Sequence, residues 1–239
     1  VAAQLALALV LLVSAGLMIR SFQALRGVDP GFTRPLQVQA FSISIPGTLV
    51  TERERVTRMQ QEILEEVSVI PGVTSAAFTT RLPMGGPRSS SALAAEGQVD
   101  DGQTPPNRHA RVVSPGLFRT QGTPLTGRDF TWTDVYEERL VAIVSENLAR
   151  ELWGSPADAL GKRIREYYDK ESPWREMVGA AADVHDDGVH EAPPATIYWP
   201  AHPRARLFGV PGYQARRVSV VLRTERAGTE GLLADVREA

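Results

Sequence analysis

The residues best suited to chemistry are five acids and imidazoles within eight positions: Asp183, His185, Asp186, Asp187 and His190. Imidazole and carboxylate groups suit zinc, manganese or non-haem iron, so Asp183, His185 and His190 are candidate metal ligands. The same stretch follows a predicted strand and contains Asp-Asp-Gly, a composition that also builds a polar turn. We favour the solvated turn, and the metal site is the alternative.

The sequence excludes several other kinds of site and one class of partner. The chain of 239 residues has no Cys, which excludes a thiol nucleophile, a disulfide scaffold and any Cys-ligated metal. Gly161-Lys162 is followed by Arg163, and Pro156 occupies the place of the first glycine, so the chain has no nucleotide-binding P-loop. A net charge of −2 gives no basic field for nucleic acid, and we expect no nucleic-acid partner.

The first 19 residues, Val1 to Ile19, contain no charged side chain and end at Arg20. A helix of this length measures roughly 28 Å, close to the roughly 30 Å apolar thickness of a bilayer. We therefore predict a transmembrane helix and its extension over residues 1–27. The predicted lipid-facing residues are Leu5, Leu7, Leu9, Val10, Leu11, Leu12, Val13, Leu17 and Ile19.

Two alternatives to a membrane span remain open. Val13-Ser14-Ala15 has the small residues of a signal-peptide cleavage site, and a wholly buried helix of a soluble protein would also be apolar. Phe22 and Leu25 continue the apolar stripe beyond that cleavage site, which favours a helix that extends into the next domain. These two residues are our candidates for coupling the helix to the domain.

A turn signal, Val28-Asp29-Pro30-Gly31, opens a folded domain. Residues 36–45 form a predicted strand in which the apolar phase slips at Ala40–Phe41, indicating a β-bulge or a strand covered on both faces. A helix follows, for which Thr51 and Glu54 have capping-box spacing, and Pro71-Gly72 ends it before a strand at residues 73–80. This pattern predicts a β-α-β unit.

The rest of the chain is predicted to be mostly strands. Residues 83–107 are rich in Gly, Ser and Pro, typical of loops. Short helices are predicted at residues 115–120 and 146–153, and a last helix follows Gly228-Thr229. The predicted strands are residues 108–113, 140–144, 162–165, 176–184, 196–199 and 218–223.

Several segments, in order along the chain, resemble a MacB-like ABC transporter permease, an FtsX-like permease with a MacB-type periplasmic core domain. The first is LALALVLLVSAGLMIRSFQALRGVDPGF, residues 5–32, which resembles the first transmembrane helix and its exit. The others are VVSPGLFRTQGTPLTGRDF (112–130), VAIVSENLARELWGSPADALGKRIR (141–165), MVGAAADVHDDG (177–188) and PPATIYWP (193–200). The resemblance is greatest to one repeat of a duplicated permease.

This resemblance implies an α+β fold: an N-terminal transmembrane helix followed by a two-subdomain extracytoplasmic core. Residues 28–82 plus 213–239 would form a discontinuous porter-like subdomain, truncated at its C-terminal end. Residues 83–212 would form an inserted, mainly β subdomain. We expect this core to lie on the extracytoplasmic, periplasmic side of a bacterial inner membrane.

The resemblance also implies a function in transport or mechanotransmission, with no enzymatic activity and no cofactor in this chain. ATP would bind a separate ABC ATPase subunit, and the permease would pair as a homodimer or as a pseudo-dimer with a second repeat. Further implied partners are the lipid bilayer and a periplasmic adaptor. Two alternatives stay open: a single-span sensor or scaffold with an extracytoplasmic ligand-binding domain, and a membrane-tethered hydrolase that uses Asp183, His185 and His190.

Overall fold

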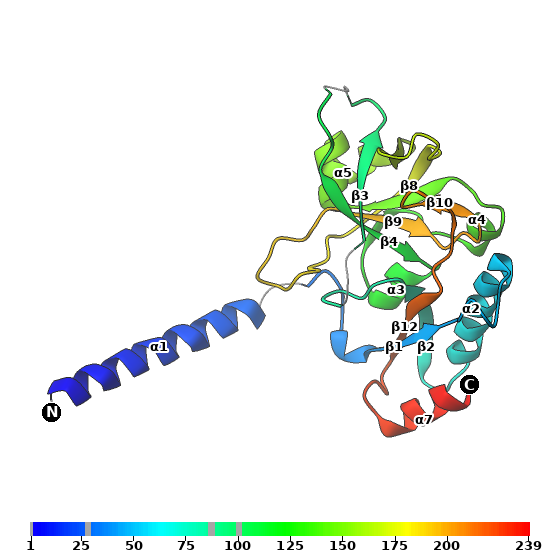
Figure 1. Ribbon diagram of the computed structural model, residues 1–239. Helices are drawn as coiled ribbons and strands as arrows, with labels where there is room; N and C mark the ends of the chain where they lie inside the picture. Colours follow the sequence, from blue (N-terminus) through cyan, green and yellow to red (C-terminus); the bar gives the residue numbers. More distant parts are fainter. Residues whose placement is uncertain (1, 27–29, 86–88, 99–101) are drawn as a thin grey trace.

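The structure is a computed structural model, and it describes residues 2–26, 30–85, 89–98 and 102–239. The N-terminal helix α1 (Ala2–Arg26) lies apart from a mixed α+β domain formed by the rest of the chain (Figure 1). Its described apolar side chains are exposed, Leu12 at 73% and Leu17 at 60%. Among the residues that the structure describes, no helix has both the length and the apolar character needed to cross a membrane.

The predicted β-α-β unit is confirmed as β1 (Val38–Ser44), α2 (Arg53–Ser68) and β2 (Val73–Thr79). Strand β12 (Arg217–Thr224) lies between β1 and β2 and is antiparallel to both, so β1 and β2 are parallel to each other. The chain then ends in α7 (Glu230–Glu238), whose first turn is capped by the Thr229 hydroxyl. Segments from the two ends of the domain therefore share one sheet.

Helices cover both faces of this three-stranded part. Alternate side chains of a strand point to opposite faces, which lets β12 contribute to two core clusters. Val218, Val220 and Leu222 pack with Leu64 and Val67 of α2, whereas Val221 packs with α3 (Leu117–Gln121). Because both faces of β12 are covered, the strand is buried along most of its length.

The structure decides between the two interpretations of β1 and corrects one local prediction. The register between β1 and β12 is regular from Val38 to Ser44, so there is no β-bulge, and the apolar phase slip reflects side chains half-buried on both faces, which is the second interpretation. Helix α2 begins after Glu52, without a side-chain cap, so Thr51 and Glu54 form no capping box. A capping box does occur at α4 (Trp132–Tyr136), between Thr131 and Asp134.

Six strands in the middle of the chain form a closed sheet. Sheet pairing runs β4-β3-β7-β8-β6-β9, and β9 then pairs in parallel with β4, which closes a small barrel. The strands are β3 (Ser90–Ala95), β4 (Asn107–Val113), β6 (Val141–Ser145), β7 (Arg163–Glu166), β8 (Arg175–Ala181) and β9 (Thr196–Pro200). Between β2 and β4 the register pairs Thr79 with Val113, which continues the sheet into the barrel.

Smaller elements surround the barrel. They are the 3-10 turn η1 (Pro35–Gln37), β5 (Leu125–Gly127), α5 (Glu146–Trp153), α6 (Pro156–Ala159), β10 (Ala205–Leu207) and β11 (Val210–Tyr213). The predicted helix at residues 146–153 coincides with α5, whereas β3 lies inside the stretch predicted as loops. One apolar cluster runs from α2 through the barrel interior, so the two predicted subdomains share a core.

Candidate coupling site at the junction with the first helix

After α1, the chain enters the domain at residues 30–33, which we call the junction segment. This segment packs against two loops. The Pro30 carbonyl accepts a hydrogen bond from the His185 backbone N–H, 3.1 Å away. The Gly31 carbonyl accepts one from the Thr123 hydroxyl at 3.2 Å. His185 belongs to the junction loop, residues 182–195, which connects β8 to β9. The segment nearest α1 is thus attached to the barrel side of the domain.

Two glycines allow the backbones to approach closely at this contact. Gly31 has a φ of +86°, and a Cβ added there would lie 2.0 Å from the Asp183 carbonyl oxygen. Gly122 has a φ of +72°, and its Cβ would lie 2.1 Å from the Thr33 hydroxyl. Since real Cβ atoms do not come so near, any side chain at either position would push the segment away.

Arg223, on β12, attaches the same segment to the β1-β12-β2 sheet. Its Nε donates to the Thr120 carbonyl at 2.8 Å, and an Nη atom donates to the Thr33 carbonyl at 3.0 Å. Guanidinium groups suit this bridging role because their donors have a fixed geometry. The junction segment therefore contacts the barrel and the sheet at the same time.

The junction loop is fixed near both of its ends. Asp183 accepts a hydrogen bond from the Asn147 backbone N–H at 2.8 Å, in the first turn of α5, where a carboxylate also interacts favourably with the helix dipole. The Asn147 side chain donates to the Pro193 carbonyl at 2.8 Å. His185 Nδ1 lies 2.8 Å from the Glu191 carbonyl oxygen, across the loop. These bonds give the loop a defined path.

A buried ion cluster holds the centre of the loop. Asp186 is 1% exposed, and its carboxylate contacts the guanidinium groups of Arg111 on β4 and of Arg81 just after β2, the latter at 3.3 Å. His109 Nδ1 lies 3.3 Å from the same carboxylate. We call Asp186, Arg81, His109 and Arg111 the Asp186 cluster. A buried carboxylate with two arginines is held far more strongly than an exposed pair.

The junction loop also holds the chain after β2. The Asp186 carbonyl accepts a hydrogen bond from the Met84 backbone N–H at 2.8 Å, and Arg81 Nε donates to the Gly85 carbonyl at 2.8 Å. Nearby, burial raises the pKa of Tyr198, whose ring packs edge-on against Phe118 at 5.0 Å. The Tyr198 hydroxyl therefore stays protonated at neutral pH.

The candidate metal ligands do not converge. Asp183 faces α5, where it also lies 3.4 Å from Arg150, and His185 bonds within its own loop. The His190 ring is 65% exposed. Among the described residues, no three His, Asp or Glu side chains are placed to hold a metal ion.

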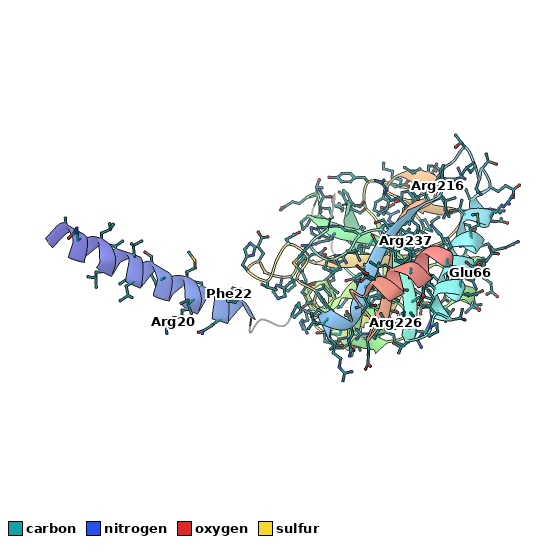
Figure 2. All side chains as sticks on the ribbon, turned by 90° about the horizontal axis from the view of Figure 1, so that it is seen from below. Arg20, Phe22, Glu66, Arg216, Arg226 and Arg237 are labelled. Atoms are coloured by element: carbon teal, nitrogen blue, oxygen red, sulfur yellow. The ribbon has the colours of Figure 1, made fainter. Side chains whose placement is uncertain are left out.

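The predicted membrane and coupling residues lie on α1. The described ones, Leu7, Leu9, Val10, Leu11, Leu12, Val13, Leu17 and Ile19, are exposed. Figure 2 shows Phe22 beside Arg20 on α1, away from the labelled domain residues Glu66, Arg216, Arg226 and Arg237, and the Phe22 side chain is 61% exposed. The side chains of Leu5 and Leu25 lie outside the described residues.

The sequence analysis missed the residues that build the junction. Arg111 could have been found, because a charged residue inside the predicted strand at 108–113 would need a buried partner. No local pattern linked it to Asp186, which lies 75 positions later in the chain. Gly31 was recognised as part of a turn, but its contact with Asp183 depends on the tertiary fold.

Comparison with solved structures identifies the architecture. The periplasmic region of MacB from Actinobacillus actinomycetemcomitans superposes with a TM-score of 0.52 at 15% sequence identity, covering 90% of this chain and 84% of that one. The chain has the fold of a MacB periplasmic region.

A domain of a protein assigned as a permease, from Porphyromonas gingivalis, aligns with a TM-score of 0.46 at 21% identity over 74% of this chain and 68% of that chain. No protein family and no curated protein gives a match to the sequence. The comparison confirms the α+β fold of a MacB periplasmic region that the sequence resemblance implies, whereas the transmembrane helix and the division into two subdomains stay predictions.

Proposed function

We propose that the chain is the extracytoplasmic core of an ABC transporter permease and that it transmits an ATP-driven conformational change across the membrane. The MacB-like fold carries this proposal. The order of the sequence segments that resemble such permeases supports it independently. In this proposal the chain catalyses no reaction, binds no cofactor, and depends on ATP bound by a separate ATPase subunit.

In this proposal α1 anchors the domain in a bacterial inner membrane. The uncharged sequence from Val1 to Ile19 and the exposure of the described apolar side chains on α1 support it. A bilayer would cover these side chains, whereas water would leave a row of apolar surface unpaired. The remaining partners of the proposal are a second permease copy or repeat and a periplasmic adaptor.

Transmission requires that movement near α1 reach the domain as a rigid-body change. The junction segment provides a route, because backbone hydrogen bonds and Arg223 connect residues 30–33 to the junction loop, to α3 and to β12. The close approach of Gly31 to Asp183 leaves little room for this segment to slide. A displacement of the segment would therefore displace the barrel and the sheet together.

The test measures distances between two copies of the full-length permease, assembled with its ATPase in lipid nanodiscs. These 239 residues contain no Cys, and any Cys elsewhere in the assembly is replaced by Ser. Phe22→Cys on α1 and, in a second sample, Val69→Cys after α2 then each introduce a spin-label site. Both side chains are exposed, at 61% and 81%. We expect a non-hydrolysable ATP analogue to shift the inter-copy distance distribution at both positions.

The same sample with an ATPase that cannot bind nucleotide is the matched control and should show no shift. A shift at Phe22→Cys alone would contradict transmission into the domain. Distributions that are unchanged by nucleotide at both positions would contradict the transporter proposal and favour the single-span sensor.

A further inference from the structure

A cavity of about 820 Å³ is lined by residues of the paired strands β3 and β7 and of the segments that follow them. Its floor includes Leu93, Ala94 and Ala95 of β3, and Pro105-Pro106 forms part of its wall. β3 lies in the upper part of Figure 1, on the barrel and away from α1. Its volume falls in the range of small-molecule sites, roughly 300–1,000 Å³. The junction described above takes no part in it.

Aromatic side chains line the opposite wall of the cavity. Tyr167 and Tyr168 pack edge-to-face at 5.4 Å, and Trp174 lies near them. Tyr168 is 70% exposed and Trp174 is 38% exposed, although both are large apolar groups. Exposed aromatic rings gathered in a concave site provide stacking surface for a flat ligand.

Arg165 adds a cation that forms no ion pair with a described acid. Its guanidinium lies over the Trp174 ring, 5.0 Å from the centroid. The Arg165 side chain lines the cavity, so its positive charge can attract an anionic group that enters it.

Two nearby arginines, Arg163 and Arg206, have carboxylate partners, unlike Arg165. Arg163, two positions earlier on β7, donates to Glu96 at 2.7 and 3.1 Å. Arg206 pairs with Asp169 and lies outside the cavity wall. Among the described residues that line the cavity there are two cations, Arg165 and Lys170, and no acid. These two cations would attract a negatively charged group in the cavity.

We propose that this cavity binds a small anionic molecule with a flat apolar part, its anionic group at Arg165 and Lys170 and its apolar part against Trp174 and the tyrosines. A carboxylate, sulfonate or phosphate would pair with the guanidinium through charge-assisted hydrogen bonds. The aromatic walls select a planar hydrophobic body. This binding site is independent of the proposed transport function.

The test titrates 2-naphthoate into the full chain in neutral phosphatidylcholine nanodiscs, with heat as the readout. Neutral lipid ensures that the bilayer supplies no competing anion. A matched probe, 2-naphthylmethylammonium, has the same ring system and the opposite charge. We expect the naphthoate to bind at least about tenfold more tightly than the ammonium probe, because a favourable charge contact is replaced by a repulsive one.

Three variants locate the binding. Arg165→Gln and Lys170→Gln should each weaken naphthoate binding, the former about tenfold through loss of a charge-assisted hydrogen bond. Arg163→Gln is the matched control, since its guanidinium is already paired with Glu96, and its affinity should equal that of the unmodified chain. Circular dichroism verifies that each variant is folded, and Lys170 is exposed at the surface, so its replacement leaves the core intact.

Equal binding of both probes, or naphthoate affinity unchanged in both Arg165→Gln and Lys170→Gln, would overturn the proposal. Heat that matches empty nanodiscs would overturn it as well, because the probe would then be partitioning into lipid. Loss of affinity in Arg163→Gln equal to that in Arg165→Gln would also contradict a specific site. Binding that follows the charge of the probe and the two cavity cations supports it.

Discussion

Two regions of the molecule bury arginine in different ways. At the junction, Arg81 and Arg111 meet the carboxylate of Asp186, and all three side chains are nearly inaccessible. In the barrel, Arg175 is 2% exposed and lies over the Trp199 ring at 4.8 Å, and it donates to the carbonyl of Arg206 at 2.8 Å. Among the described residues, Arg175 forms no ion pair.

The two regions differ in how precisely the contacts of their buried arginines position the neighbouring segments of the chain. At the junction, a carboxylate from one loop holds arginines from two other segments, so the cluster specifies where the loop lies. In the barrel, burial lowers the pKa of Arg175 to about 10, and the nearby charges of Glu166 and Asp169 oppose this shift only in part. We infer that the junction is the more rigidly positioned region, as a coupling site requires.

Removing the carboxylate of the Asp186 cluster should have the largest effect. Asp186→Asn keeps the size of the side chain but removes the countercharge that Arg111 contacts, and it leaves Arg81 paired with Asp187 alone, 3.4 Å away. Breaking a buried ion pair from one side costs about 3–5 kcal/mol of unfolding free energy. Urea unfolding of the chain in nanodiscs, followed by tryptophan fluorescence, measures the loss.

The matched control is Glu54→Gln, because Glu54 and Arg204 form an ion pair with both side chains more than half exposed. Such surface pairs contribute about 0–1 kcal/mol. If Asp186→Asn and Glu54→Gln lower the urea midpoint equally, the junction has no special positioning role.

In the barrel, the burial of a titratable side chain should make the stability of the protein depend on pH. Burial and the nearby Arg175 lower the pKa of His202 to about 4, with Asp134 opposing the shift. In the unfolded chain its pKa is about 6.5, so the unfolded state binds more protons between these values. Stability from this group is thus complete above pH 6.5 and is lost as the pH falls toward 4, by about 3 kcal/mol.

Urea unfolding at pH 7.5 and pH 4.5 measures this dependence of stability on pH. The variant His202→Gln separates the contribution of His202 from that of the carboxylates that also titrate in acid. Asp134, whose pKa is lowered chiefly by its hydrogen bond to Arg128 against the opposing effect of burial, also loses stability in acid, but it does so in both proteins. We expect the stability of His202→Gln to fall less between the two pH values. Equal losses would show that His202 titrates as it does in water.

Much of the fold was predictable because it depends on local pattern. The β-α-β unit was confirmed, since Pro46-Gly47 and Pro71-Gly72 mark the ends of elements with clear apolar periodicity. The strand β3 was missed because its sequence, SSALAA, consists of small residues with low strand propensity. Its place is set by pairing with β4, the next strand, and with β7, which is far along the chain.

The candidate site was less predictable because it is assembled from distant segments. The acidic and imidazole cluster at residues 183–190 was a solvated turn in our preferred interpretation, whereas Asp186 is buried by Arg81 and Arg111. Those arginines come from other strands, so no spacing along the chain reveals the cluster. The sequence analysis placed the loop correctly, but it predicted a solvated environment for Asp186, which is buried.

The smallest expected effect concerns the close contact at Gly31 and separates crowding from backbone strain. Gly31 and the control position Gly97 have nearly the same φ, +86° and +87°, so alanine is equally strained at both. Of the two, only Gly31 has another atom within 4 Å of the added Cβ. We expect Gly31→Ala to cost about 1–3 kcal/mol more in urea unfolding than Gly97→Ala, because of overpacking. Amide exchange at His185, whose N–H bonds Pro30, should accelerate only in Gly31→Ala. Equal stability and exchange in the two variants would mean that the junction segment can shift without cost, and the proposed route from α1 to the domain would then lack its rigid contact.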